Sequence, residues 1–192
     1  PFFKDFILPA GLLRESRSGA QRADLVVVSK CPEQLTTQEM ERYTSRIRKY
    51  TSPATPVLFS TFKYGAAVSI GKAERLTQDV VLLTGIANPA PLRSYLQAQG
   101  YRVVKEYSFP DHHTYTTQDL AAVKDDILAG KGQSISIVTT SKDAVKLTAQ
   151  PLIATTRELP LFYLPIEVVF LENVDLFDAA VTKHVKQFYA RL

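Results

Sequence analysis

Hydrophobic residues in this chain form short continuous runs that are separated by turn residues and amphipathic stretches. The clearest runs are residues 25–28 and 80–83, and both are bounded by polar residues. Continuous runs of this length predict strands that are buried on both faces, inside a parallel sheet. Residues 101–109 and 134–139 predict two further strands, because they are rich in residues that favour extended structure.

Four segments between and after these strands predict helices. They cover residues 37–50, 89–100, 117–129 and 176–189. Thr36 or Thr37 can cap the first helix, and Thr117 can cap the third. Gly130 and Gly132 are expected to end the third helix.

Strands and helices therefore alternate along most of the chain. Parallel strands need helical crossovers, so this order predicts an α/β fold, a three-layer α/β/α sandwich with a mainly parallel sheet. The composition changes between Pro53 and Pro56. We expect residues 1–55 to be the remnant of one α/β domain and residues 56–192 to form a second, more complete one.

Two segments predict the strands of a linker. Val57–Tyr64 has a partial apolar and polar alternation, which favours a half-exposed strand. Residues 161–171 predict another strand, in which Pro165 fits only an edge or a bulge. We expect these two segments to pair as a two-stranded antiparallel linker between the domains.

Composition and charge exclude some classes of protein. The chain has 192 residues, of which 45% are apolar and 22% charged, so we expect a globular protein without extensive disorder. The net charge of +4 is not concentrated in Lys and Arg clusters, so we expect no nucleic-acid partner. Cys31 is the single cysteine and cannot form an internal disulfide, which favours a reducing compartment.

The longest apolar stretch and the first residue bear on the location of the chain. Residues 159–171 are interrupted by two prolines and Glu167, and they fall short of the ~20 residues of a membrane-spanning helix. We therefore expect this chain by itself to be soluble. Because it begins at Pro1 and continues into an apolar segment, we interpret it as part of a longer protein.

A polar cluster, Asp111-His112-His113, follows the predicted strand at residues 101–109. Strand ends are the usual place of a site in α/β proteins, and a carboxylate beside an imidazole can exchange a proton near neutral pH. The cluster can equally be a polar turn in which Asp111 caps the following structure. Neighbouring residues of an extended segment point to opposite sides, so only one of the two histidines should face a given site. His184 is the one other histidine, so the residues favour no metal site.

Two further segments carry polar groups that are suited to anions. Arg14 and Glu15 follow a turn that contains glycine; arginine can bind phosphate through two N–H groups, and glutamate can orient a hydroxyl. A surface ion pair explains these two residues equally well. Ser141 and Asp143 follow the strand at residues 134–139, where capping of a helix explains both.

The sequence contains no phosphate-binding loop of the common type. That loop needs Gly, four residues, and then Gly-Lys followed by Ser or Thr. The segment from Gly65 to Gly71 and Lys72 is one residue too long and continues with Ala73, which has no hydroxyl. We therefore expect no nucleotide site in this chain.

Five motifs occur in one order and together cover almost the whole chain. They are Leu8-Pro-Ala-Gly-Leu-Leu-Arg-Glu15, Ala23-Asp-Leu-Val-Val-Val28, Thr84-Gly-Ile-Ala-Asn-Pro89, Phe109-Pro-Asp-His-His113 with Tyr115, and Lys142-Asp-Ala-Val-Lys146. In these motifs the chain resembles the C-terminal part of the tetraacyldisaccharide 4′-kinase family, the kinases of lipid A biosynthesis.

The resemblance implies an enzyme that transfers the γ-phosphate of ATP, with Mg²⁺, to the 4′-hydroxyl of tetraacyldisaccharide 1-phosphate, the lipid A disaccharide precursor. It implies a peripheral protein on the cytoplasmic face of the bacterial inner membrane. Residues 1–55 would then be the remnant of the N-terminal nucleotide-binding domain, and the family's P-loop lies upstream of Pro1. Because phosphoryl transfer depends on that loop and on magnesium, we expect the isolated chain to be inactive.

The resemblance also implies roles for single residues. The catalytic pair is Asp111 and His112, in which His112 accepts the hydroxyl proton together with an aspartate of the N-terminal domain. Arg14 and Glu15 match the family's Arg-Glu pair near the phosphates and the acceptor. Ser141 stands where the family usually has Glu, which leaves that position without an implied role. No metal ligand is expected in this chain.

Two other functions remain open. Asp-His-His also marks a class of metal-dependent phosphoesterases, which need paired aspartates upstream as metal ligands. The upstream aspartates here, Asp5, Asp24 and Asp79, are not paired in the sequence. The third alternative is a noncatalytic α/β binding module.

Overall fold

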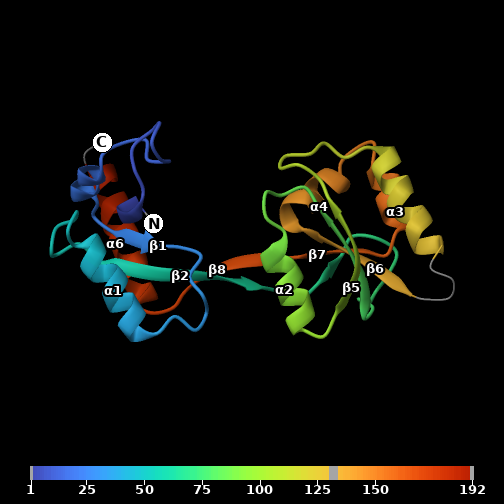
Figure 1. Cartoon of the computed structure of the whole chain (residues 1–192), viewed down its shortest axis with the longest axis horizontal. Coiled ribbons are helices and arrows are strands. Elements are labelled where there is room, and N and C mark those ends of the chain that lie inside the picture. The colour runs from blue at the N-terminus through green and yellow to red at the C-terminus, as the bar shows by residue number, and fades with distance from the viewer. Residues whose placement is uncertain (1, 130–133, 191–192) are drawn as a thin grey trace. The chain divides into compact units, whose positions relative to one another are not determined.

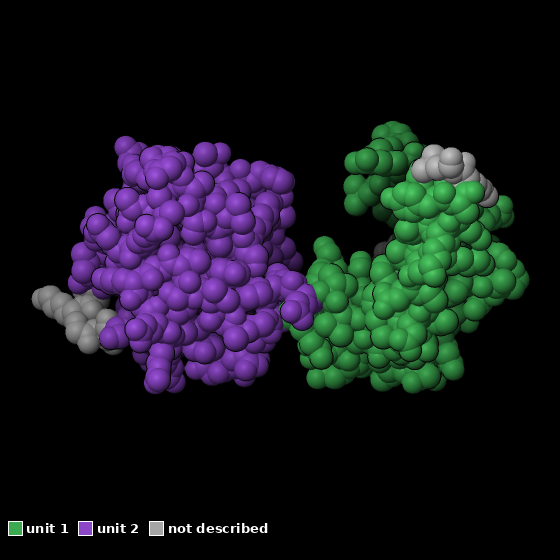
Figure 2. Space-filling model, turned by 180° about the vertical axis from the view of Figure 1, so that it is seen from behind, with its two compact units in different colours: residues 1–63, 168–192 green, residues 64–167 purple. Residues whose placement is uncertain are grey.

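The computed structural model of the protein describes residues 2–129 and 134–190. The chain divides into two compact units, which are coloured separately in Figure 2. The first is Pro1–Lys63 with Val168–Leu192, and the second is Tyr64–Glu167. Each unit has its own sheet.

The second unit is built on a five-stranded sheet with the order β3-β7-β6-β4-β5. Figure 1 labels β5, β6 and β7 of this sheet. The strands are β3 (Val68–Ser69), β4 (Asp79–Thr84), β5 (Arg102–Ser108), β6 (Ile135–Thr140) and β7 (Leu161–Leu164). β4 pairs in parallel with β5 on one side and with β6 on the other, and β6 pairs in parallel with β7. The edge strand β3 runs antiparallel to β7. The prediction of a mainly parallel sheet is therefore confirmed.

Helices cover both faces of this sheet. They are α2 (Ala90–Ala98) on one face, and α3 (Thr117–Ala129), α4 (Ser141–Leu147) and α5 (Ile153–Glu158) on the other. Val80 and Leu82 of β4 belong to the core cluster under α2. Val81 and Leu83 belong to the cluster under α3 and α4. Since successive side chains of a strand alternate between faces, a central strand with both faces covered needs a continuous apolar run. The three-layer α/β/α prediction is confirmed.

The strand order reverses at β4. The chain passes from β4 through α2 to β5 on one side, and then through α3 to β6 on the other side. In open α/β sheets, sites lie at the carboxyl ends of the strands where the order reverses. The loops that follow β4, β5 and β6 are therefore the place to look for a site.

The first unit contains a three-stranded sheet with the order β1-β2-β8. Its elements are the 3₁₀ helices η1 (Phe2–Lys4) and η2 (Arg17–Arg22), β1 (Val26–Val28), α1 (Thr37–Ile47), β2 (Val57–Tyr64), β8 (Ile166–Phe170) and α6 (Val174–Tyr189). α1 connects β1 to its parallel neighbour β2. Thr36 caps α1 in a reciprocal arrangement with Glu39, which decides between the two predicted caps.

β2 and β8 pair with each other, as predicted for the linker. The amide of Leu171 donates to the carbonyl oxygen of Phe59 at 2.8 Å, and the amide of Gly65 donates to that of Pro165 at 2.9 Å. Residue numbers increase along β2 while those of the paired residues in β8 decrease, so the two strands are antiparallel. The prediction of a single strand at residues 161–171 was wrong. Pro165 separates β7 from β8, and these two strands belong to different sheets.

Three further expectations about the first unit need correction. β2 is exposed only toward its end: residues 58–61 are buried, because β2 is the central strand between β1 and β8, whereas Phe62 and Lys63 are exposed. β1 pairs in parallel but lies at the edge of the sheet formed by the described residues, and Val27 is exposed. Residues 168–192 belong to the first unit rather than to a domain of residues 56–192, because β8 pairs with β2.

Gly130 and Gly132, which were expected to end α3, lie outside the described residues. Within residues 2–129 and 134–190, no helix combines the length and the apolar character that crossing a membrane requires.

A substitution at Gly71 tests how closely the segment after β3 packs against the residues before β7. A methyl group at Gly71 would collide with the carbonyl oxygen of Leu159, which accepts a hydrogen bond from the amide of Lys72. We expect Gly71→Ala to lower the free energy of unfolding of the second unit by about 1–3 kcal/mol, as overpacking does. Urea denaturation measures the difference. Gly65→Ala is the control, because its methyl group would lie 3.4 Å from Pro165, an ordinary contact; equal losses for both variants would contradict the reasoning.

Candidate functional site

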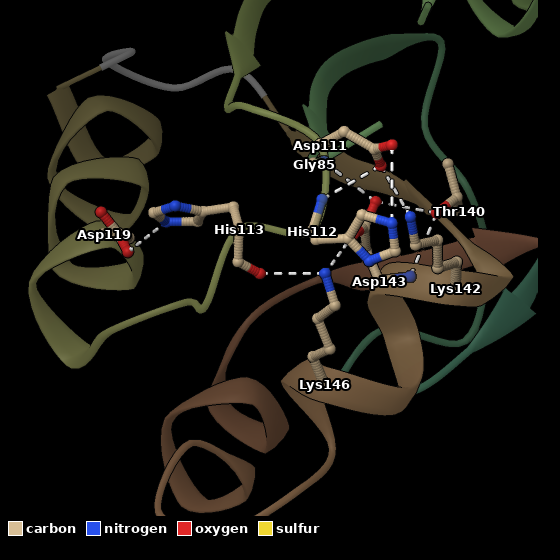
Figure 3. A network of polar contacts seen from close by, with 9 residues as sticks. All are labelled: Gly85, Asp111, His112, His113, Asp119, Thr140, Lys142, Asp143 and Lys146. Carbon is tan, nitrogen blue, oxygen red and sulfur yellow. Dashed lines mark hydrogen bonds and ion pairs between the residues drawn. The ribbon is translucent and has the colours of Figure 1, made fainter. Parts of the chain in front are cut away.

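A group of polar side chains lies beyond the carboxyl ends of β4, β5 and β6 (Figure 3). β5 leads into it: the amide of Phe109 still donates to the carbonyl oxygen of Thr84 at 2.8 Å, which extends the strand pairing by one residue. The chain then turns, and the amide of His113 donates to the carbonyl oxygen of Pro110 at 3.1 Å. This turn, residues 110–113, carries the predicted Asp-His-His cluster. We call it the histidine turn.

His112 is the most exposed of the three polar residues in the histidine turn, with 79% of its side chain accessible, against 42% for Asp111 and 24% for His113. Its φ angle is +63°, a left-handed conformation that is uncommon outside glycine but tolerated by His, Asn and Asp. Its amide donates to Oδ1 of Asp111 at 3.0 Å, and its Nε2 lies 3.6 Å from Oδ2 of the same carboxylate. The structure therefore places an accessible imidazole directly beside a carboxylate.

Asp111 is held by a lysine of α4. Nζ of Lys142 donates to Oδ1 of Asp111 at 2.7 Å. This hydrogen bond lowers the pKa of Asp111, and the charges of His112 and Lys142 lower it further. Asp111 is thus ionised at neutral pH. The alternative of a polar turn is confirmed in part, because residues 110–113 form a turn and Asp111 accepts from the amide of His112. Asp111 does not cap the helix that follows.

His113 points away from His112, toward α3 (Figure 3). Its ring is stacked on Phe109 with the centroids 4.2 Å apart, and its Nε2 lies 3.0 Å from Oδ2 of Asp119. Only 24% of the side chain is exposed. Contacts with a core-facing aromatic ring and a helix carboxylate give His113 a packing role. The two histidines do diverge as expected, but the cause is a tight turn rather than the alternation of a strand.

Asp119 joins this contact to the start of α3. Its Oδ2 accepts hydrogen bonds from the amide and the hydroxyl of Thr116, at 2.8 and 2.9 Å, while Oγ1 of Thr116 accepts from the amide of Asp119. Thr116 is therefore the capping residue, and the prediction of Thr117 was wrong by one position. Burial alone would raise the pKa of Asp119, but the hydrogen bonds with His113 and Thr116 outweigh it and lower the pKa.

α4 begins with a buried carboxylate. Thr140 caps the helix by accepting from the amide of Asp143, where Ser141 was expected to be the cap. Oδ2 of Asp143 accepts from the hydroxyl of Thr140 at 2.8 Å and from the amide of Gly85 at 3.0 Å. The side chain of Asp143 is completely buried. It connects the loop after β4 to the helix after β6. Ser141 donates instead to the carbonyl oxygen of Leu164 at 3.2 Å.

Lys146 and Tyr115 lie on the other side of this carboxylate. Nζ of Lys146 lies 3.5 Å from Oδ1 of Asp143 and donates to the carbonyl oxygen of His113 at 2.9 Å. Burial raises the pKa of Tyr115, and the negative charge of Asp143 raises it further, so the phenol stays protonated. The ammonium group of Lys146 also lies 5.8 Å from the centre of the Tyr115 ring.

The site described here does not fit a magnesium ion. Among residues 2–129 and 134–190, no three histidine, cysteine or acidic side chains come together as a metal site. Asp111 already binds the ammonium group of Lys142, whose charge opposes a second cation, and the two histidines diverge. These side chains do not form the ligand set that an Asp-His-His phosphoesterase needs.

Arg14 and Glu15 belong to the first unit, and both are exposed. Glu15 forms an ion pair with Arg22 at 2.7 Å rather than with Arg14. The polar group of the second unit does not include them. His184 is exposed on α6.

From the sequence we expected a role for Asp111 and His112, and none for Asp119, Lys142 or Lys146. A signal for Asp119 was present, because Thr116 and Asp119 have the spacing of a capping box. Lys142 and Lys146 are four residues apart, which places them on one face of a helix. Nothing in that spacing indicates what they contact.

The second unit is thus an α/β protein of the doubly wound class, with an exposed imidazole and a carboxylate at the reversal of its strand order. The model of one protein family, described as tetraacyldisaccharide-1-P 4′-kinase, matches residues 1–186. The chain belongs to this family.

Individual relatives agree with the family match. The tetraacyldisaccharide 4′-kinase of Cytophaga hutchinsonii is 38% identical over 190 residues, which is 95% of this chain and 51% of the relative. That of Flavobacterium johnsoniae is 34% identical over 186 residues, again 95% and 51%. The chain therefore spans about half the length of the curated relatives it matches.

The fold is also similar to that of a solved structure. It is the crystal structure of LpxK from Aquifex aeolicus in complex with ATP, with 22% identity and a TM-score of 0.56. The match covers 94% of this chain and 48% of that one. At this identity the likeness supports the arrangement of strands and helices and no more.

Asp119 tests the link between the histidine turn and α3. Because the pKa of Asp119 is lowered on folding, its ionised form stabilises the protein above the ordinary aspartate value of about 3.9. That stabilisation is lost as the pH falls through the lowered pKa. We expect the free energy of unfolding to fall more steeply for the wild type than for Asp119→Asn between about pH 5 and pH 2, so that the two curves converge.

Urea denaturation at stepped pH measures both curves. Asp125→Asn, which changes an exposed aspartate of the same helix, is the matched control and should follow the wild type. A difference between wild type and Asp119→Asn that stays constant over the whole range would contradict the assignment.

Proposed function

We propose that the complete protein containing this chain transfers the γ-phosphate of ATP to the 4′-hydroxyl of tetraacyldisaccharide 1-phosphate, with Mg²⁺. Membership of the tetraacyldisaccharide 4′-kinase family supports this reaction class and this lipid substrate. The fold shared with an ATP complex is consistent with ATP as the donor. The lipid substrate makes the cytoplasmic surface of the bacterial inner membrane the place of the reaction.

The observation that carries the proposal is the exposed His112 beside the ionised Asp111. A kinase of this type needs a group that takes the proton of the attacking hydroxyl, and a histidine is suited to that role near neutral pH. The imidazole of His112 is accessible to a substrate, whereas that of His113 is occupied by Phe109 and Asp119. In our proposal, His112 accepts the hydroxyl proton, and the charge of Asp111 stabilises the protonated ring.

The magnesium ion and the phosphate-binding loop that the reaction needs are not supplied by the histidine turn. In phosphoryl transfer, the metal and the phosphate-binding loop supply most of the charge stabilisation. The described residues of this chain offer neither group, so we place both in the part of the relatives that this chain does not span. For Arg14 and Glu15 we propose contacts with the phosphates and the acceptor. Glu15 would then exchange its ion pair with Arg22 for these contacts.

The isolated chain should therefore hydrolyse no ATP and phosphorylate no lipid disaccharide. The sequence lacks the phosphate-binding loop, and the polar group at β4, β5 and β6 does not suit a magnesium ion. An assay with labelled ATP and the lipid disaccharide, with the complete enzyme as positive control, measures this. Turnover of ATP or of the lipid disaccharide by a preparation free of the complete enzyme would contradict this expectation.

The two histidines should differ in the complete enzyme. We expect His112→Ala to lower kcat by about 10² to 10⁴-fold, the usual contribution of general base assistance. His113→Ala should lower kcat much less while reducing stability, because its ring packs on Phe109 and bonds to Asp119. Steady-state kinetics and thermal denaturation of both variants separate the two roles. Equal losses of kcat would contradict the assignment to His112.

A further inference from the structure

α4 presents two lysines to the histidine turn, one on each side of His112 (Figure 3). Lys142 contacts Asp111, the residue before it, with Nζ 2.7 Å from Oδ1. Lys146 contacts His113, the residue after it, with Nζ 2.9 Å from the carbonyl oxygen. Residues four apart lie on the same face of a helix. A single helical turn therefore holds both neighbours of the exposed imidazole.

The contacts of the two lysines matter because the backbone of His112 has an uncommon conformation. A left-handed φ of +63° is sparsely populated for residues other than glycine, and it persists only where the surroundings determine it. Lys142 binds Oδ1 of Asp111, the same carboxylate oxygen that accepts a hydrogen bond from the backbone of His112.

α4 is itself fastened to the sheet. Asp143 is buried and accepts from the amide of Gly85 and the hydroxyl of Thr140. Its other oxygen lies 3.5 Å from Nζ of Lys146. The ammonium group that holds the carbonyl of His113 is therefore placed by a buried carboxylate at the sheet edge. A buried, hydrogen-bonded group of this kind has little freedom to move.

Global stability does not explain the pair formed by Lys142 and Asp111. Its side chains are 41% and 42% exposed, and exposed ion pairs contribute little to folding. What the pair does fix is local geometry. An error of about 1 Å in the position of a catalytic group can cost about 100-fold in rate.

We propose that Lys142 and Lys146 are positioning residues for His112. They hold the histidine turn from both sides so that the imidazole keeps one orientation toward the substrate hydroxyl. Neither lysine takes the proton. The inference rests on the proposed function, in which His112 is the proton acceptor.

Kinetics of the complete enzyme test the proposal. Lys142→Met and Lys146→Met should each lower kcat by about 10- to 100-fold with KM little changed, because the substrate still binds beside a misplaced base. Lys142→Arg keeps a cation beside Asp111 and should restore most of kcat. In the background of His112→Ala, neither lysine substitution should lower kcat further, because a positioning residue acts through the group it holds.

Lys124→Met is the matched control. Lys124 is also 41% exposed and forms an ion pair of 2.9 Å, but it joins α3 to Glu158 of α5. Its loss removes the same kind of contact without touching the histidine turn. We expect wild-type kcat and KM for this variant.

A second measurement reads the conformation of His112 directly in the 192-residue chain. A left-handed residue has its amide and α protons close together, so its intraresidue NOE between them is strong. The chain has three histidines, and selective ¹⁵N-histidine labelling makes the signal of His112 assignable. We expect this NOE to weaken when Lys142→Met and Lys146→Met are combined, and to stay strong in Lys124→Met. An unchanged NOE in the combined variant overturns the proposal.

The outcomes separate this inference from the proposed function. If His112→Ala leaves kcat unchanged, the proposed role of His112 fails. If His112→Ala lowers kcat but the lysine variants retain full kcat, or lower it by the same factor with and without His112, only the positioning inference fails. A rise in KM at constant kcat would also overturn it, because the lysines would then bind substrate.

Discussion

The buried carboxylate of Asp143 is the contact on which the polar edge of the second unit depends. A carboxylate without exposed surface is tolerated only when donors surround it. The amide of Gly85 and the hydroxyl of Thr140 donate to one oxygen, and the ammonium group of Lys146 lies near the other. Gly85 follows β4 and Thr140 ends β6, so one side chain joins the two strands at which the strand order reverses. The loops at this edge are placed relative to it.

Gly85, whose amide donates to Asp143, is closely surrounded by other side chains. A methyl group at this position would lie 3.2 Å from Oδ1 of Asp143 and from the hydroxyl of Tyr115, and 3.3 Å from Cβ of His113. Such distances are shorter than ordinary packing contacts, so the neighbours would have to shift. Glycine is needed here for close approach between loops. This packing brings the loop after β4, the histidine turn and α4 together beneath the exposed His112.

The described parts of the two units differ in how completely they are packed. In the first unit, the buried apolar side chains are Cys31, Ile47, Leu58 and Phe59, whereas the second unit has a buried cluster on each face of its sheet. The Asp111 and His112 pair is carried by the unit with the larger core. An accessible group on a well-supported turn has the combination that a catalytic residue requires. Arg14 and Glu15 belong to the other unit, where Glu15 pairs with Arg22 on the surface.

The sequence by itself determined the alternation of strands and helices, the parallel sheet and the position of the Asp-His-His cluster, because hydrophobic periodicity and short motifs are local properties of a chain. Only the tertiary structure decided that Pro165 separates two strands of different sheets, that Ser60 is buried, and that His113 faces α3. It also decided that Lys146 holds the carbonyl oxygen of His113, 33 residues earlier in the chain. These features depend on which elements become neighbours in space, and a local pattern predicts that a residue will lie on a helix or a strand without specifying its partner across the sheet.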